Sequence, residues 1–537
     1  MPVRAALCLL LFATSARGAP FRLASIFGSG MVLQRDAPVR VWGWGRPGST
    51  TYGALINTAT NGSALAEGAA DVSGLWQLRF APQAAARGVY KLALTSSPLD
   101  EARCDAYQFF CSGASVELTG ISMGDVLLGI GQSNMQVDVA FAFNSTLELG
   151  AANALGGTVK VFQVAAAATA NDGPLDDFAM PPQIPWSPAS NTSLPTFSAT
   201  LWFSAKALLE ARPPADADVP LGLIAAPWGG TAIKAHAPLS VNATCGHLYP
   251  FPYGSNGGDC GLDHAPCNAS TLFNSLIAPI AGPAGFAVSA MVWFQGENDA
   301  QVLELAYYAC ELRELAASLR AAFASPAAHW TTVQLAPYTG GAALGPFREM
   351  QCATTWGAIA NSSCAVIVDD GDVLSPIGTV HSRNKQLVGR RVAAGLAAAL
   401  YGAASAERGP QYAGAALASA PGGLLSADVR FDPATLGGRA LVYAPPAASQ
   451  WSNSSRCPAE LGIVRLQDCA WFYILASDAR AYNATVTLGA GGTTLHLEAQ
   501  APAGVQAVGT SYGFNAWPVV SYYNAAGWPM VPWNATA

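Results

Sequence analysis

The chain has 537 residues, of which 51% are hydrophobic and only 11% are charged, and its net charge is −7. This length predicts about three or four domains. The apolar content excludes a disordered chain, which buries too little surface to offset its ordering entropy. The acidic balance excludes a general nucleic-acid binder, because such proteins present cations to phosphates.

The first residues have the composition of a secretory signal peptide. Arg4 precedes an apolar run at 5–13, and the small residues Ala16 and Gly18 suit cleavage near Gly18. We therefore expect residues 1–18 to be a signal peptide and the chain to enter the secretory pathway, ending secreted or in a lysosome-like compartment. No later stretch reaches about 18 uncharged apolar residues of helical character, so the sequence predicts no membrane span.

Cysteines and glycosylation motifs fit the same compartment. Ten cysteines lie outside the signal segment, an even number that suits disulfides in an oxidising environment, whereas a zinc site lacks Cys-x-x-Cys spacing. Three candidate pairs are close in sequence, with the connectivity left open: Cys104/Cys111, Cys352/Cys364 and Cys457/Cys469. Nine Asn-x-Ser/Thr motifs predict a glycosylated chain: Asn61, Asn144, Asn191, Asn242, Asn268, Asn361, Asn453, Asn483 and Asn534.

Three regions follow the signal segment. Residues 19–119 predict a β-sandwich-like domain, because MVLQR, VRVWGWG and LWQLRF are short runs separated by turn signals. Residues 120–404 predict an α/β domain, in which apolar runs alternate with helical stretches. Residues 405–537 predict a β-rich end, with ALVYAP, WFYILA and TVTLGA as strands.

The α/β region has the pattern of a parallel sheet buried on both faces. Its expected strands are uninterrupted apolar runs: 125–130, 221–226, 290–294, 332–335 and 365–368. Its expected helices lie between them, the last with Ser382 as its N-cap candidate: 200–211, 303–323 and 385–401. Ligands of such sheets bind beyond the carboxyl ends of the strands, so we expect the chemistry there.

Four polar segments lie at such positions. Gly131-Gln132-Ser133-Asn134 follows the first strand, where a turn presents a serine to the crevice and its N–H to an oxyanion, although a capped glycine turn has the same pattern. Trp228-Gly229-Gly230 follows the second strand, and its glycines either aim an N–H at an oxyanion or form an ordinary turn. Gln295-Gly296-Glu297-Asn298-Asp299 follows the third strand. His381 lies in the fourth, between the last strand and the last helix, where Ser133 and His381 would meet above the sheet.

The four segments, in this order, resemble the sialate O-acetylesterases, part of the wider GDSL/SGNH-type hydrolase group. The matching blocks are GDVLLGIGQSNMQ, LGLIAAPWGGTAI, MVWFQGEND and SPIGTVHSRNKQLVGRR, and the resemblance covers roughly residues 21–402. It implies an SGNH-type three-layer α/β hydrolase domain with β-rich accessory regions at both ends. It also implies a serine esterase that acts on an O-acetylated carbohydrate, with no metal or organic cofactor.

The resemblance implies a role for each segment. Ser133 is the expected nucleophile and His381 its general base. The N–H groups of Ser133 and Gly230, with an amide of Gln295 or Asn298, are the expected oxyanion donors.

Two positions depart from the family pattern. Many relatives carry an aspartate two or three residues before the histidine, where this chain has Gly378 and Thr379. The candidates for the orienting acid are therefore Asp369, Asp370 and Asp372 at the end of the preceding strand, of which Asp372 is favoured, and Glu297 is the alternative. Asp299 also stands where relatives often have asparagine.

Substrate specificity is less defined by the sequence. Trp228, Trp293 and Phe294 are either sugar-packing or core residues. Three cations are candidates for an anionic sugar's carboxylate: Lys234, Arg383 and Lys385. The alternatives are an acetylxylan or other polysaccharide O-acetylesterase, and a non-catalytic carbohydrate-binding relic.

Overall fold

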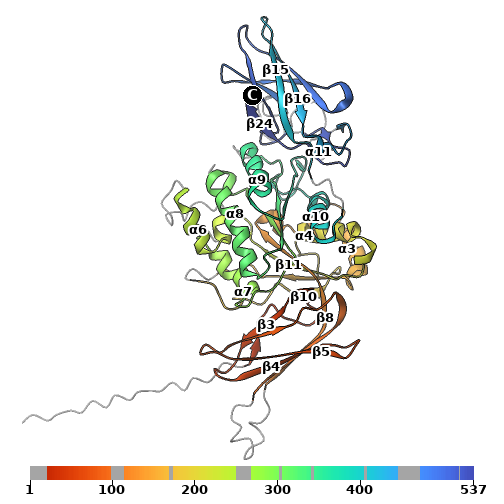
Figure 1. Ribbon diagram of the computed structural model, residues 1–537, viewed down its shortest axis with the longest axis vertical. Helices are drawn as coiled ribbons and strands as arrows, with labels where there is room; N and C mark the ends of the chain where they lie inside the picture. The colour runs from red at the N-terminus through yellow and green to blue at the C-terminus, as the bar shows by residue number, and fades with distance from the viewer. Residues whose placement is uncertain are drawn as a thin grey trace, which may run out of the picture.

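The longest strand, β8 (Ser115–Gly131), runs from an N-terminal group of strands into the middle of a mainly parallel sheet (Figure 1). It belongs to a computed structural model whose described residues are 21–97, 114–168, 173–248, 268–301, 305–339, 344–403, 408–444, 472–518 and 520–536. The expected signal segment and the candidate pairs Cys104/Cys111 and Cys457/Cys469 lie outside these ranges.

The sheet that carries the candidate site has the strand order β10-β9-β11-β8-β12-β13-β14. Only the β9–β10 pair along this path is antiparallel. The strands besides β8 are β9 (Val159–Gln163), β10 (Ile184–Pro188), β11 (Leu221–Pro227), β12 (Ala290–Phe294), β13 (His329–Val333) and β14 (Ser362–Ala365). The chain adds β9 and β11 on one side of β8 and then crosses to β12 on the other, which is where open α/β sheets form their ligand crevice.

Helices cover both faces of this sheet because successive side chains of a strand point to opposite faces. Leu127 of β8 packs in one core with Leu201 and Val392, whereas Leu128 packs in the other with Leu312. The first core includes α4 (Ala199–Ala211) and α10 (Lys385–Tyr401). The second includes α6 (Leu239–Cys245), α7 (Ala278–Ala281), α8 (Leu305–Ala322) and α9 (Leu344–Ala358), drawn on the left of Figure 1. Shorter helices are α2 (Ser133–Gln136), α3 (Ser145–Ala152), α5 (Ile233–His236) and α11 (Pro433–Leu436).

Short strands form both ends of the chain. The N-terminal strands are β1 (Arg22–Leu23), β2 (Val32–Gln34), β3 (Val39–Trp44), β4 (Thr50–Asn57), β5 (Gly62–Ala69), β6 (Leu75–Phe80) and β7 (Ala86–Ser96). The C-terminal strands are β15 (Tyr412–Ser419), β16 (Leu424–Phe431), β17 (Val442–Tyr443), β18 (Phe472–Ala476), β19 (Ala481–Asn483), β20 (Thr485–Leu488), β21 (Thr494–Gln500), β22 (Ala507–Tyr512), β23 (Tyr522–Tyr523) and β24 (Trp533–Thr536). The C-terminal strands have a core of their own, which also meets the Cys352–Cys364 disulfide.

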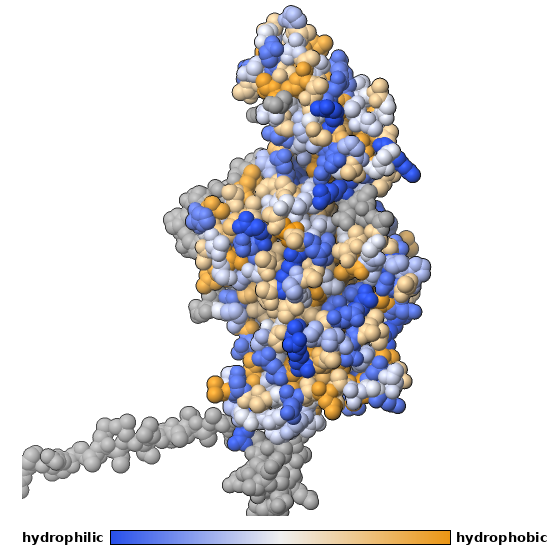
Figure 2. Space-filling model, in the orientation of Figure 1, coloured by the Kyte–Doolittle hydropathy of each residue, from blue (hydrophilic) through white to orange (hydrophobic). Residues whose placement is uncertain are grey.

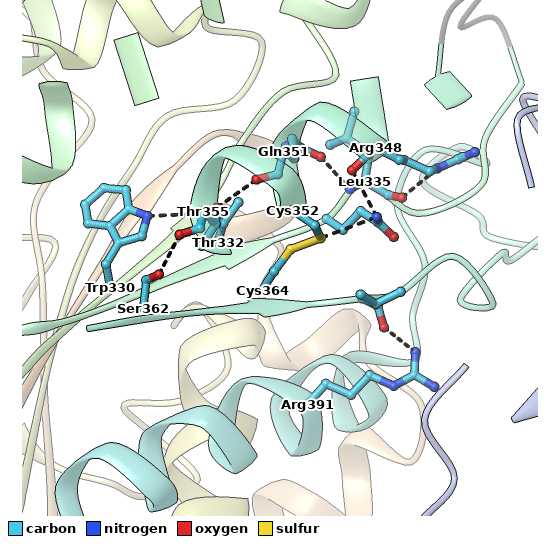
Figure 3. Close-up of a disulfide and its surroundings, with 12 residues drawn as sticks. Trp330, Thr332, Leu335, Arg348, Gln351, Cys352, Thr355, Ser362, Cys364 and Arg391 are labelled. Atoms are coloured by element: carbon cyan, nitrogen blue, oxygen red, sulfur yellow. Dashed lines mark hydrogen bonds between the residues drawn. A yellow bond between two sulfur atoms is a disulfide. The ribbon is translucent and has the colours of Figure 1, made fainter. Parts of the chain in front are cut away.

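That disulfide ties α9 to β14 in a mostly buried polar setting (Figure 3). Thr355 of α9 donates to Thr332 over 2.7 Å, and Gln351 accepts from the Leu335 amide over 3.0 Å. These bonds satisfy buried polar groups, so they hold α9 at one position along the sheet. The pairing of Cys352 with Cys364 confirms one candidate pair, whereas the Cys245–Cys310 disulfide was not anticipated.

The visible face mixes hydrophilic and hydrophobic residues (Figure 2). Single exposed apolar side chains are normal for a folded protein whose polar residues cannot cover its surface. Within the described residues, every helix is too short or too polar to cross a bilayer.

Most expected elements of the α/β region are present, with shifts at their ends. Helix α10 covers 385–401 as predicted, but its N-cap is Asn384, and Ser382 instead accepts from the Asn384 amide. β14 begins three residues before the expected 365, because the structure pairs Ser362 with Trp330 of β13. Strands β9 and β10 and helix α9 were not anticipated.

The expected boundary between residues 119 and 120 falls inside β8, so the two regions share a strand. Asp125 of β8 also joins them. Its carboxylate accepts from Arg35 Nε over 3.0 Å and from the Tyr401 hydroxyl over 2.8 Å. Because Asp125 is 3% exposed, its charge depends on these donors.

Replacing Asp125 with alanine is expected to lower the free energy of unfolding by about 3 kcal/mol, because Arg35 and Tyr401 lose a buried acceptor. Denaturant unfolding measures this change. Asp36→Asn is the matched control, since that exposed carboxylate lies 3.9 Å from Arg35 and asparagine tolerates its φ of 56°, and it is expected to change stability by less than about 0.5 kcal/mol. Equal effects of the two variants would contradict the prediction.

Candidate active site

Ser133 opens helix α2 directly after β8 ends at Gly131. Gly131 has a φ of 137°, and a Cβ built there would lie 2.1 Å from the Phe294 carbonyl oxygen. Glycine is therefore required where β8 and β12 run closest. The Gln132 amide donates to the same carbonyl over 3.0 Å, which fixes the turn that presents Ser133.

The glycine turn after β11 lies against Ser133. The Trp228 amide donates to the Gly131 carbonyl over 2.9 Å, and the Gly229 amide donates to Gln136 Oε1 over 2.7 Å. A Cβ added to Gly229 would lie 3.2 Å from the Ser133 Cβ. Gly230 follows in the left-handed region, with a φ of 72°. The structure thus brings two of the expected segments together.

Gln295 lies in a buried network and does not suit the expected role of oxyanion donor. It is fully buried, and its Nε2 donates to Gln132 Oε1 over 3.0 Å and to the Thr231 carbonyl over 2.9 Å, with Asp299 as a further acceptor. An amide nitrogen carries only two hydrogens, so these acceptors use it fully. Asn298 is 8% exposed and stays a candidate donor.

Asp299 has a structural role that sequence reasoning did not assign. Its carboxylate accepts from the Ile233 amide over 3.0 Å as well as from Gln295. Burial raises the pKa of Asp299 to about 6, although both hydrogen bonds favour the charged form. This carboxylate therefore orients the amide of Gln295 from below the site.

His381 lies in the loop before α10 and is held by a backbone carbonyl. Its Nδ1 lies 2.7 Å from the Ile377 carbonyl oxygen, which only accepts hydrogen bonds. The hydrogen must therefore sit on Nδ1, which leaves Nε2 as the proton acceptor. Burial lowers the pKa of His381, with a further lowering by the charge of Lys385. The neutral, basic form is thus favoured.

Asp372 does not take the expected place behind His381. Arg383 holds both of its oxygens, with Nε at 2.6 Å from Oδ2 and Nη2 at 3.0 Å from Oδ1. The planar guanidinium matches a carboxylate in this two-pronged way, and Arg383 follows His381 by only two residues. Asp372 therefore anchors the loop that carries His381.

Glu297 lies on the other side of the turn, in contact with Asn134. It is 4% exposed and accepts from Asn134 Nδ2. Burial raises the pKa of Glu297, opposed by the hydrogen bond from Asn134 and by the charge of Lys385. The alternative carboxylate is thus part of a buried cluster directly behind the turn that carries Ser133.

Asn134 brings the serine turn and the histidine loop side by side. Its Nδ2 also donates to the Val380 carbonyl over 2.9 Å, so the neighbour of Ser133 contacts the neighbour of His381. Lys385 Nζ donates to Asn134 Oδ1 over 2.7 Å. Asn134 was present in the quoted motif, but no pattern in the sequence indicated its three partners.

Some of the residues considered for sugar binding are buried in the structure, and others lie beside the site. Trp293 and Phe294 are fully buried core residues, whereas Trp228 is half-buried beside the site. Lys385 is 1% exposed and donates to Asn134, which removes it as a partner for a sugar carboxylate. Arg383 is bound to Asp372.

Comparison with known proteins gives a family match for this chain. A family model described as carbohydrate esterase, sialic acid-specific acetylesterase, matches residues 123–394, just over half of the chain. The chain belongs to this sialic acid-specific acetylesterase family.

Two relatives of this family member are the sialate O-acetylesterases of Pongo abelii and Homo sapiens. They are 27% and 26% identical to it over 73% of its chain and 74% of theirs. A solved carbohydrate acetylesterase from Xanthomonas citri is 24% identical, with a TM-score of 0.72 over 96% of this chain and 99% of that one. This likeness shows that the two chains share one fold over nearly their whole lengths.

In this acetylesterase family member, Gly229→Ala is expected to lower kcat for an aryl acetate about 10²-fold, because the added Cβ would displace Ser133, the expected nucleophile. Steady-state kinetics measures the loss, and thermal unfolding should change little. Gly357→Ala is the control, since a Cβ there meets nothing within 4 Å. Full activity of Gly229→Ala would contradict the close packing of the two turns.

Proposed function

We propose that this chain is a serine esterase that hydrolyses O-acetyl esters of sialic acid or related sugars through an acetyl-enzyme. The observation that carries the proposal is the Asn134–Val380 hydrogen bond, which places the turn of Ser133 beside the loop of His381. Membership in a carbohydrate esterase family supports the hydrolysis of acetyl esters on sugars.

The reaction has two halves. His381 Nε2 accepts the hydroxyl proton while Ser133 Oγ bonds to the acetyl carbonyl carbon. The tetrahedral intermediate then breaks its bond to the sugar oxygen, which receives the proton from His381. Water next loses a proton to His381 and attacks the acetyl-enzyme, so that acetate leaves and Ser133 regains its hydrogen. Neither a metal nor an organic cofactor enters these steps.

The negative oxygen of each intermediate needs preorganised donors. The Ser133 and Gly230 amides and the Asn298 side chain are the proposed set, with Gln295 assigned instead to the buried support beneath them. Losing one such donor typically lowers the rate by about 10²–10³.

The orientation of His381 rests in this proposal on the Ile377 carbonyl, 2.7 Å from Nδ1. A carbonyl holds the tautomer as a carboxylate would, although it stabilises the imidazolium less. Glu297 is buried behind the turn of Ser133, where it accepts from Asn134, and it does not occupy the place that relatives give to aspartate.

Ser133→Ala is expected to abolish acetate release from 4-nitrophenyl acetate while the thermal unfolding midpoint stays unchanged. A fluorophosphonate probe should label the wild-type chain at Ser133 and leave the variant unlabelled. These two measurements also test the carbohydrate-binding relic: an unlabelled wild-type chain, or full turnover by Ser133→Ala, would contradict the serine mechanism.

One observation favours a second candidate, a polysaccharide O-acetylesterase acting on a neutral sugar. Two of the three cations considered for an anionic sugar, Arg383 and Lys385, have partners within the protein. An anionic sugar gains affinity from an available cation, whereas a neutral sugar needs none.

The two candidates differ in their rates on defined substrates. The proposed function predicts a kcat/KM for O-acetylated sialic acid at least tenfold above that for acetylated xylan, and competition between the two substrates measures the ratio. The reverse ratio would assign the neutral-polysaccharide activity instead, with Ser133→Ala as the blank in both assays.

We also propose that the chain works in the secretory pathway. The Cys245–Cys310 and Cys352–Cys364 disulfides support an oxidising compartment. Among the expected glycosylation motifs, Asn242 is unsuitable in the folded protein. Its Nδ2 is buried and donates to the Ala237 carbonyl and to Ser270.

A further inference from the structure

The side chain of Asn134 contacts the histidine loop, the third polar segment and helix α10. Its Oδ1 accepts from Lys385 Nζ over 2.7 Å. Its Nδ2 donates to Glu297 Oε1 and, over 2.9 Å, to the Val380 carbonyl. Since Asn134 is 1% exposed, these bonds replace its contacts with water.

The chemistry of the partners fixes which way this amide points. The ammonium of Lys385 only donates hydrogen bonds, whereas the Val380 carbonyl only accepts them. A flipped amide would face Lys385 with its NH₂ group and the Val380 carbonyl with its oxygen, breaking both bonds. Lys385 therefore determines that the hydrogens of Asn134 point toward the histidine loop.

The surroundings of Lys385 disfavour its positive charge. It is 1% exposed at the first position of α10, where the positive end of the helix dipole disfavours a cation. A cation–π contact offsets part of this cost, because its Nζ lies 5.3 Å from the centre of the Phe294 ring. Burial lowers the pKa of Lys385, opposed first by the charge of Asp370 and then by that of Glu297. A buried ammonium in this setting needs compensating bonds, and its bond to Asn134 lies directly behind the nucleophile turn.

We propose that Lys385 is a positioning residue for the reaction: acting through Asn134, it holds the turn of Ser133 against the loop of His381. This inference rests on the proposed serine mechanism. In this role Lys385 acts indirectly. Its effect on Ser133 and His381 passes through the Asn134 amide and the Val380 carbonyl.

Lys385 also influences the charge state of the general base. The charged groups around the histidine loop come from several elements: Lys385 of α10, Glu297 after β12, Asp370 and Asp372 after β14, and Arg383 of the loop itself. The charge of Lys385 lowers the pKa of His381. Removing it must raise that pKa, so a higher pH becomes necessary to obtain the neutral base.

The test uses the full chain with Lys385→Met, which keeps the length of the side chain and removes its charge. The kcat for 4-nitrophenyl acetate is expected to fall about 10²-fold while KM changes less than about threefold, since the geometry of attack suffers and substrate contacts remain. The acid limb of the kcat/KM profile is expected to shift to higher pH. The rate of fluorophosphonate labelling should fall in parallel with kcat.

A second variant, Asn134→Asp, covers the case in which Lys385→Met folds poorly. It is nearly isosteric and keeps an acceptor for Lys385, but the ionised side chain cannot donate to the Val380 carbonyl and faces Glu297 with a like charge. It is expected to lose kcat to a similar extent at unchanged KM. In the double variant the two losses should not add, because both act through one contact.

Lys206→Met is the matched control, because it removes a lysine from another ion pair of the same domain, 2.6 Å from Glu148. It is expected to keep kcat and the pH profile. Wild-type kcat and an unshifted acid limb in Lys385→Met would overturn the inference, as would a loss explained wholly by a smaller folded fraction. Failure of the proposed function looks different: the wild-type chain then resists the probe, or Ser133→Ala stays active.

Discussion

The parallel pairing of β8 on both of its sides is the constraint on which the candidate site depends. Gly131 at the end of β8 is paired with Pro227 of β11 and with Phe294 of β12. Three strands therefore end in one row, and the polar segments that follow them begin at the same level. Because of this register, the Ser133 hydroxyl, the glycine turn after β11 and the buried amide cluster lie next to one another.

Beneath that row lies a concentration of buried polar groups. One side of the Ser133 turn is supported by Gln132, Gln295 and Asp299, and the other by Asn134, Glu297 and Lys385. Desolvating such groups is unfavourable, so the region depends on complete pairing. The surrounding strands and helices supply that stability through two large apolar cores. The two apolar cores of the scaffold thus offset the energetic cost of burying these polar groups.

Sequence reasoning reached the mixed α/β class, the main strands of the central sheet and the segments that meet at its edge. These follow from apolar runs, whose length and composition reflect burial on both faces. Helix α9 was missed because Gly345 and Pro346 lie in its first turn and Gly357 near its end, a composition that disguises a helix stabilised by tertiary contacts. Strands β9 and β10 are short and carry lysine or proline, so the pattern around them resembles a loop.

Partner choice within the site was beyond the sequence. Asp372 lies nine residues before His381 and eleven before Arg383, so chain distance alone favoured neither, and only the geometry of the loop selects the guanidinium. Lys385 begins a helix and has the pattern of a solvated cation, yet the fold turns it inward.

The shared strand β8 has a consequence for how the chain can be divided. A fragment cut at residue 119 would break β8, and each piece would keep an incomplete sheet. A fragment without the C-terminal strands would also expose apolar surface, because the core of these strands includes Cys352, Cys364 and Val366.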